Sequence, residues 1–238
     1  MSARFEELDW QQTAMGDLSL RRRVEPSLGV EVFEVKLGDE YLMSSLFTVA
    51  EEELAALGLA ASVGEEAASL DVLVGGLGLG YTAIAALRDP RVRALTVIDT
   101  MPAVIAWHEA GLLPVSISLT TDARTSLVLD DFFALMRRPP GDGARWDAIL
   151  LDVDHSPRHQ LDPSHADLYT MPGLRALSRH LVDGGVFALW SDDPPDEDFL
   201  ATMALVFVDP VAHIVDFANP ITGGTSSNTV YVARSRVA

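Results

Sequence analysis

The chain has 238 residues, a length that suits one domain with a small appendage and allows a large buried core. Its 17 basic and 35 acidic residues give a formal net charge of −18, which argues against nucleic-acid binding and favours cationic partners or simple solubility. There is no cysteine for disulfides or thiolate chemistry, no signal-like start and no apolar run of membrane-spanning length, so we expect a soluble, cytoplasmic protein without membrane contact.

The predicted elements begin with an antiparallel β meander, to which we assign residues 1–48. Its strands are predicted at residues 17–24, 30–37 and 40–47, with turn-forming residues between them. A helix follows from residue 49 to about residue 59. The three glutamates at 51–53 complement the positive end of its dipole, and the sequence indicates no further function for them.

A glycine-rich turn then follows the apolar strand at 71–75. Gly76, Gly78 and Gly80 alternate before helix-forming residues, so the backbone can turn sharply and approach a ligand at the start of a helix. Asp99 closes the next apolar strand, nineteen residues after Gly80. An acid at this distance commonly binds ribose hydroxyls, and the combination predicts a nucleotide or nucleoside pocket.

From residue 70 onward, predicted strands and helices alternate. The strands are expected at 71–75, 94–99, 115–119, 146–152 and 185–191, and the helices at 80–88, 102–110, 124–137, 165–180 and 196–206. Two further apolar segments, 211–217 and 229–233, have no helix between them and predict a terminal antiparallel hairpin. The expected α/β fold is therefore a Rossmann-like, mostly parallel seven-stranded sheet with a reversed last strand and helices on both faces, built from residues 49–238.

Acidic residues follow most of these predicted strands. Asp99 follows the second strand, Asp122-Ala123 the third, Asp152 and Asp154 the fourth, and Asp192-Asp193 the fifth. Ligands of open α/β sheets bind outside the carboxyl ends of the strands. A group of acidic side chains beside a nucleoside pocket therefore favours a cationic substrate.

In this order the residues resemble the spermidine synthase (polyamine aminopropyltransferase) family, which has the fold of class I S-adenosylmethionine-dependent methyltransferases. Residues 76–82 resemble its glycine turn, and Asp99 falls in its acidic segment. The resemblance implies that Asp122-Ala123 receives the adenine amino group and that Asp152 is the base on the attacking amine. Tyr169 also fits the family pattern, and the family's N-terminal β domain implies a homodimer.

Two departures from the family pattern remove carboxylates that its reaction uses. Leu79 stands where the glycine turn of the family has an aspartate that holds the charged end of the aminopropyl donor. His155 aligns with the second aspartate of the catalytic segment, while Asp154 lies one position off. His155 is therefore a candidate base in place of that aspartate, and Asp154 and Tyr169 complete the candidate catalytic set.

The histidines near the catalytic segment are of a residue type that binds zinc or iron. His155 and His159 would share one face of a helix, but Pro157 lies between them and argues against a regular helix there. No metal is therefore expected.

Three functions remain open at the sequence level. The leading interpretation is aminopropyl transfer from decarboxylated S-adenosylmethionine to a small cationic amine such as putrescine. Methyl transfer from S-adenosylmethionine is the first alternative, because Leu79 removes a carboxylate from the turn. The second alternative is a catalytically silent protein that binds a nucleoside or polyamine.

Overall fold

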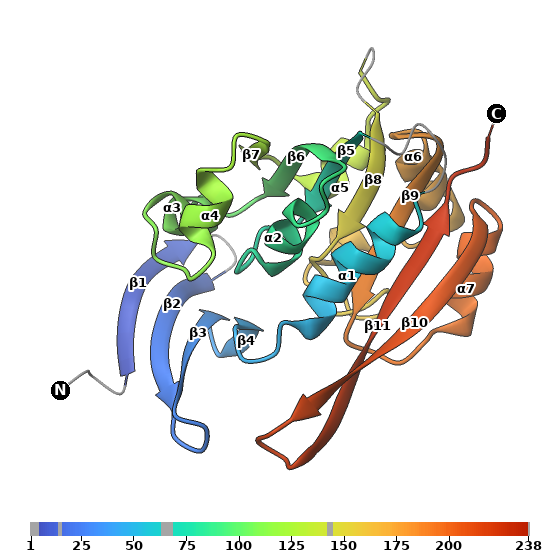
Figure 1. Cartoon of the computed structure of the whole chain (residues 1–238). Coiled ribbons are helices and arrows are strands. Elements are labelled where there is room, and N and C mark those ends of the chain that lie inside the picture. The colour runs from blue at the N-terminus through green and yellow to red at the C-terminus, as the bar shows by residue number, and fades with distance from the viewer. Residues whose placement is uncertain (1–4, 14–15, 63–68, 142–144, 238) are drawn as a thin grey trace.

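Two sheets lie side by side in the computed structural model, which describes residues 5–13, 16–62, 69–141 and 145–237 (Figure 1). The smaller sheet is antiparallel and has the order β1-β2-β3-β4. Its strands are β1 (Phe5–Thr13), β2 (Gly16–Glu25), β3 (Val30–Leu37) and β4 (Glu40–Ser44). The predicted meander is confirmed, and the structure adds a first strand, β1, that the sequence did not predict. The residues of β1 are mostly polar and exposed, so they lack the apolar pattern of a strand.

The larger sheet has seven strands in the order β10-β11-β9-β8-β5-β6-β7. All neighbours pair in parallel except β11, which is antiparallel to both β9 and β10. The strands are β5 (Leu70–Gly75), β6 (Val92–Asp99), β7 (Thr125–Leu129), β8 (Trp146–Leu151), β9 (Leu181–Ser191), β10 (Val208–Asn219) and β11 (Gly224–Arg234). The predicted seven-stranded, mostly parallel sheet with a reversed last strand is thus confirmed.

Helices cover both faces of this sheet, and a buried apolar cluster fills the space on each side. One cluster includes side chains of α1 (Val49–Ala60), α2 (Tyr81–Leu87), α3 (Pro102–Glu109) and α4 (Ser116–Thr120). The other includes side chains of α5 (Phe132–Arg137), α6 (Met171–Ser178) and α7 (Glu197–Ala204). A short 3-10 turn, η2 (Pro163–His165), precedes α6.

The third strand of the sheet lies later in the chain than the sequence predicted. Residues 115–119 were expected as a strand, but most of them form α4. Their alternating pattern is misleading, because Ser116 and Leu119, three residues apart, are fully buried while Ile117 is 68% exposed. Spacing of three is a helical period. The strand is instead β7, which occupies the start of the predicted helix 124–137, and only the end of that segment forms α5.

Candidate active site

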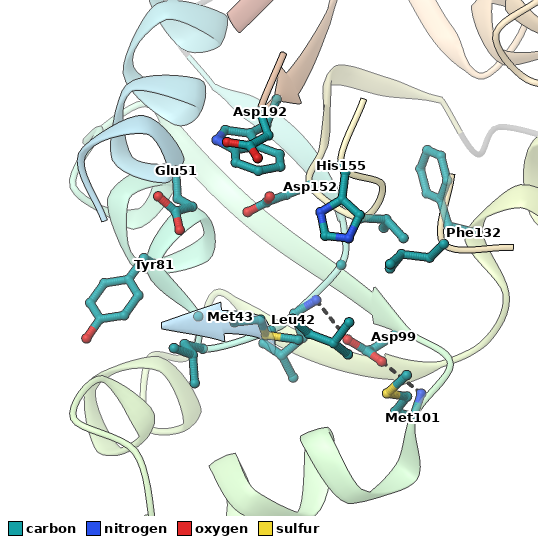
Figure 2. A pocket seen from close by; sticks show the side chains of 18 of the residues that line it. Leu42, Met43, Glu51, Tyr81, Asp99, Met101, Phe132, Asp152, His155 and Asp192 are labelled. Atoms are coloured by element: carbon teal, nitrogen blue, oxygen red, sulfur yellow. Dashed lines mark hydrogen bonds between the residues drawn. The ribbon is translucent and has the colours of Figure 1, made fainter. Parts of the chain in front are cut away.

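A pocket of about 820 Å³ lies at the carboxyl ends of the parallel strands (Figure 2). The glycine turn after β5 and the acids after β6, β7, β8 and β9 line it. Residues of β4, α1 and β11 close its other sides. The pocket therefore forms where an open parallel sheet places its ligand, and the N-terminal meander contributes to its wall.

The glycine turn can approach this pocket only because it lacks side chains. Gly76 has φ +95°, and a Cβ there would lie 2.0 Å from the backbone oxygen of Asp152. Gly80, with φ +89°, is the N-cap residue of α2, and a Cβ there would lie 2.8 Å from the His108 ring. His108 is fully buried and its Nε2 lies 3.0 Å from the carbonyl oxygen of Gly78. The three predicted glycines thus all line the pocket, and a buried ring from α3 supports their turn.

Asp99, at the end of β6, connects the glycine turn to the loop after β6 through two hydrogen bonds. Its Oδ2 accepts a hydrogen bond from the backbone N–H of Leu77 at 3.0 Å, and its Oδ1 accepts one from Met101 at 2.8 Å (Figure 2). Burial raises the pKa of this carboxyl, while the backbone donors favour its charged form. Each carboxylate oxygen keeps a lone pair, so the side chain can still accept a hydroxyl from a ligand.

Asp122 and Ala123 do not lie with the other candidate site residues. They precede β7, at its amino end, and neither lines the pocket. The Asp122 carboxylate pairs with the Arg124 guanidinium at 2.7 Å, and that contact lowers the pKa of Asp122 to about 2. Their predicted position depended on a strand at 115–119 that is a helix. The expected adenine contact therefore has no support in this geometry.

The acids that follow the real third strand are Asp130 and Asp131, and both line the pocket. Asp131 caps α5 by accepting a hydrogen bond from the Ala134 N–H at 3.0 Å. Asp130 accepts a hydrogen bond from the N–H of Asp131 at 2.8 Å. The sequence does contain a pattern that predicts their position, because an acid directly before the apolar residues Phe132 and Phe133 is typical of a helix N-cap.

Asp152 lies on the pocket wall at the end of β8. Its backbone N–H donates to the Gly75 carbonyl at 2.8 Å, and its Oδ2 accepts the Thr82 hydroxyl at 2.6 Å. Burial raises the pKa of Asp152 to about 6. A carboxyl group poised near neutral pH in a cleft is suited to accept a proton from a bound ligand.

Glu51, near the start of α1, faces the same part of the pocket (Figure 2). Burial, and then the charge of Asp152, raise the pKa of Glu51 to about 8. Sequence reasoning assigned this glutamate only to the helix dipole. The direction of its side chain depends on how α1 packs on the sheet, which no local pattern shows.

Asp154 and Tyr169 lie behind the pocket wall and do not line it. Asp154 is 1% exposed, and its carboxylate accepts hydrogen bonds from the Tyr169 hydroxyl at 2.7 Å, the Leu161 N–H at 2.8 Å and His165 Nδ1 at 2.8 Å. The His165 ring stacks on Phe133 with 3.6 Å between centroids, and His165 does line the pocket. Asp154 and Tyr169 are thus placed to position the loop after β8.

His155 lines the mouth of the pocket, where its Nε2 lies 3.2 Å from the Glu40 carboxylate of β4. This contact joins the loop after β8 to the N-terminal meander. The side chains near the glycine turn are apolar: Leu79 is 5% exposed, and Leu42 and Met43 of β4 lie close by (Figure 2). The position that differs from the family's aspartate thus belongs to an apolar wall.

The described part of the chain shows neither a cluster of metal ligands nor a membrane-spanning helix. Among the described residues, no group of three or more histidine, cysteine, aspartate or glutamate side chains is arranged to hold a metal ion. Within the same part of the chain, every helix is too short or too polar to cross a membrane.

Comparisons with known proteins agree with this architecture. No protein-family model matches the chain. A polyamine aminopropyltransferase of Mycobacterium tuberculosis is 28% identical over 133 residues, which are 56% of this chain and 24% of that protein. One of Corynebacterium efficiens is 31% identical over 123 residues, which are 50% of this chain and 22% of that protein. The matched segments thus span only about a quarter of these relatives.

Solved structures match nearly the whole chain. Spermidine synthase from Thermotoga maritima has a TM-score of 0.72 at 17% identity, covering 98% of this chain and 74% of that one. A spermidine synthase in complex with the transition state analogue AdoDATO matches with the same score and identity, covering 98% of this chain and 73% of that one. A probable spermidine synthase from Corynebacterium glutamicum has a TM-score of 0.63 at 17% identity, with 96% and 79% covered. The chain therefore shares the fold of spermidine synthases.

Proposed function

We propose that this protein transfers the aminopropyl group of decarboxylated S-adenosylmethionine to a primary amine such as putrescine. The observation that carries the proposal is the carboxyl group of Asp152, enclosed at the end of β8 beside a glycine turn built to approach a ligand. The similarity to proteins named polyamine aminopropyltransferase, and to a spermidine synthase that binds a transition state analogue, supports the same reaction.

The donor would occupy the side of the pocket formed by the glycine turn and the loops after β6 and β7. In this proposal Asp99 accepts a hydrogen bond from a ribose hydroxyl, and Asp130 accepts one from the adenine amino group, the role that the resemblance implied for Asp122. Ile98 and Met101 offer apolar surface for the base. The sulfonium of the donor would then face the centre of the pocket, near Asp152.

Catalysis needs positioning and the removal of one proton. The Asp152 carboxylate accepts a proton from the ammonium of the acceptor, and the nitrogen lone pair forms a bond to the propyl carbon of the donor. The carbon–sulfur bond breaks, and its electron pair remains on sulfur. The products are methylthioadenosine and the aminopropylated amine.

The test is an assay of the purified full chain with decarboxylated S-adenosylmethionine and putrescine, with methylthioadenosine measured by chromatography. The variant Asp152→Asn should lower kcat by ~10²–10⁴-fold, since it removes the proton acceptor but keeps the shape. Asp122→Asn is a matched control, because Asp122 lies outside the pocket. A wild-type protein that forms no methylthioadenosine with any amine would contradict the proposal.

Methyl transfer is a second candidate, favoured by the apolar wall at Leu79, Leu42 and Met43. This wall offers no carboxylate to the ammonium of an aminopropyl group. Calorimetry with the two donors separates the candidates: tighter binding of S-adenosylmethionine than of its decarboxylated form would favour methyl transfer. Binding of methylthioadenosine without turnover of either donor would instead favour the silent, ligand-binding protein.

A homodimer through the N-terminal sheet is also proposed. Phe5 and Trp10 of β1 and Tyr41 of β4 are each more than half exposed, and burial of such side chains would favour association. Light scattering on the purified protein should give twice the monomer mass of 25.7 kDa, and a monomer would contradict this proposal.

A further inference from the structure

Two carboxylates from distant parts of the chain meet on one wall of the pocket. Glu51 comes from the first turn of α1 and Asp152 from the end of β8 (Figure 2). The Thr82 hydroxyl of α2 lies 2.6 Å from Asp152 Oδ2 and 3.3 Å from the backbone oxygen of Glu51. One α2 side chain thus contacts both segments and fixes their relative positions.

The described residues around this pair include no permanent cation in the pocket lining. Among the described residues that line the pocket, none is lysine or arginine. The other titratable groups near the pair in the pocket lining are Tyr81 of α2, Asp192 after β9 and His155 after β8 (Figure 2). On α1 itself, the charge of Glu52 is matched by its ion pair with Arg88. The pair is therefore acidic, enclosed and without a compensating charge of its own.

Two enclosed carboxylates cannot both ionise freely, so a site of this kind retains a proton until a cation arrives. The direction of both pKa shifts agrees with this expectation, because the pKa of Glu51 and that of Asp152 are raised. An ammonium group would provide both charge and hydrogen-bond donors, whereas an anionic or neutral ligand would leave the pair uncompensated.

We infer that Glu51 and Asp152 act together as the site that binds the ammonium of the acceptor and receives its proton. Glu51 lies outside every motif that carried the family resemblance, so it is an additional catalytic residue of this chain. In the step, the pair as two carboxylates binds R–NH₃⁺ and takes one proton. The neutral amine then attacks the donor carbon, and the carbon–sulfur electron pair stays on sulfur. The identity of the acceptor rests on the proposed function.

The kinetic test compares Glu51→Gln with Glu53→Gln, the same substitution on the same helix at a position that does not line the pocket. Glu51→Gln should raise the KM for putrescine by ~10-fold or more, because it removes a charge-assisted contact. The affinity for methylthioadenosine should stay within about twofold of wild type, since the donor side is unchanged. The Glu53→Gln variant should behave as wild type.

The pH profile gives a readout that a merely structural role would not change. In wild type, kcat/KM should rise with pH as the pair loses its last proton. In Glu51→Gln only Asp152 remains to lose a proton. The midpoint of the rise in kcat/KM, which is the acidic limb of the profile, should therefore shift to a pH lower by about one unit or more. An unchanged KM for the amine and an unchanged acidic limb would overturn the inference, as would a loss of methylthioadenosine binding.

A titration that needs no turnover separates this inference from the proposed function. Carboxyl ¹³C NMR of the protein saturated with methylthioadenosine should show a resonance with a midpoint near 8 that disappears in Glu51→Gln and persists in Glu53→Gln. Added putrescine should lower that midpoint by about one pH unit, since bound ammonium favours the charged pair. An absent resonance or an unmoved midpoint overturns the inference, even if wild type forms methylthioadenosine. If wild type forms none, the proposed function fails while this titration still tests the pair.

Discussion

Glu51 makes the stability of the folded protein depend on pH in an unusual direction for an acid. Its pKa rises from an ordinary value of 4.5 to about 8 on folding, so the folded state holds a proton that the unfolded chain releases. Asp152 acts in the same direction, because folding raises its pKa from 3.8 to about 6. The contribution of this pair to stability is therefore present at low pH and is lost as the pH rises through this window.

The prediction is that Glu51→Gln has a higher Tm than wild type at pH 8 and a similar Tm near pH 4.5. Removal of a buried, uncompensated charge should be worth about 2 kcal/mol at pH 8, or roughly 4–8 °C for a chain of this size. Thermal unfolding by circular dichroism at both pH values provides the measurement. Acids that do not interact with Glu51 contribute equally to both proteins and cancel in the difference, whereas relief of the repulsion on Asp152 adds to the gain. A lower Tm of the variant at pH 8 would show that Glu51 makes a favourable charged contact.

Gly76 is a second position at which one residue determines the site. Gly76→Ala should destabilise the protein by about 3 kcal/mol or more, because the new Cβ meets the Asp152 backbone at 2.0 Å in addition to the strain at positive φ. Gly29→Ala is the matched control: Gly29 also has positive φ, but nothing lies within 4 Å of its Cβ position. That variant should lose only about 1 kcal/mol. Urea unfolding of both variants provides the measurement, and equal losses would contradict the steric argument.

At the scale of single elements, the position of β7 puts Asp130, and not Asp122, in the lining of the pocket where we propose that adenine binds. Asp130→Asn should weaken methylthioadenosine binding by ~10-fold, since the amide replaces a charged acceptor. Asp122→Asn should leave the affinity unchanged, because Asp122 pairs with Arg124 at the other end of the strand. Isothermal titration calorimetry measures both. A stronger effect of Asp122→Asn would restore the original prediction from the sequence.

The same element shows what the sequence could and could not predict. The strand–turn–helix signal around Gly76 and the acids at Asp99 and Asp152 were recognisable because each lies within one short, uninterrupted pattern. Residues 115–119 were misassigned because five residues satisfy the periods of both strand and helix. The role proposed for Glu51 was not visible, since it depends on the packing of α1 against β8, β9 and β11, which all lie far later in the chain.

At the scale of the whole molecule, the meander and the larger domain share one core. Leu18 and Leu20 of β2 belong to the same buried cluster as Leu54 of α1 and Trp107 of α3. The indole N–H of Trp107 donates to the Asp9 carboxylate of β1 at 2.6 Å. The wall of the pocket also depends on β4. The boundary placed at residue 48 therefore separates segments of sequence that are packed together.

We accordingly predict that the full chain unfolds in one cooperative transition and that residues 49–238 alone do not fold to a binding-competent state. Without the meander, apolar side chains of α1 and α3 would face water, which weakens a core that the two parts share. Differential scanning calorimetry of the full chain should show a single transition, raised in temperature by methylthioadenosine. The truncated chain should show neither that transition nor the ligand-dependent shift. Two separate transitions in the full chain, or a truncated chain that binds methylthioadenosine, would show instead that the larger domain is independently stable.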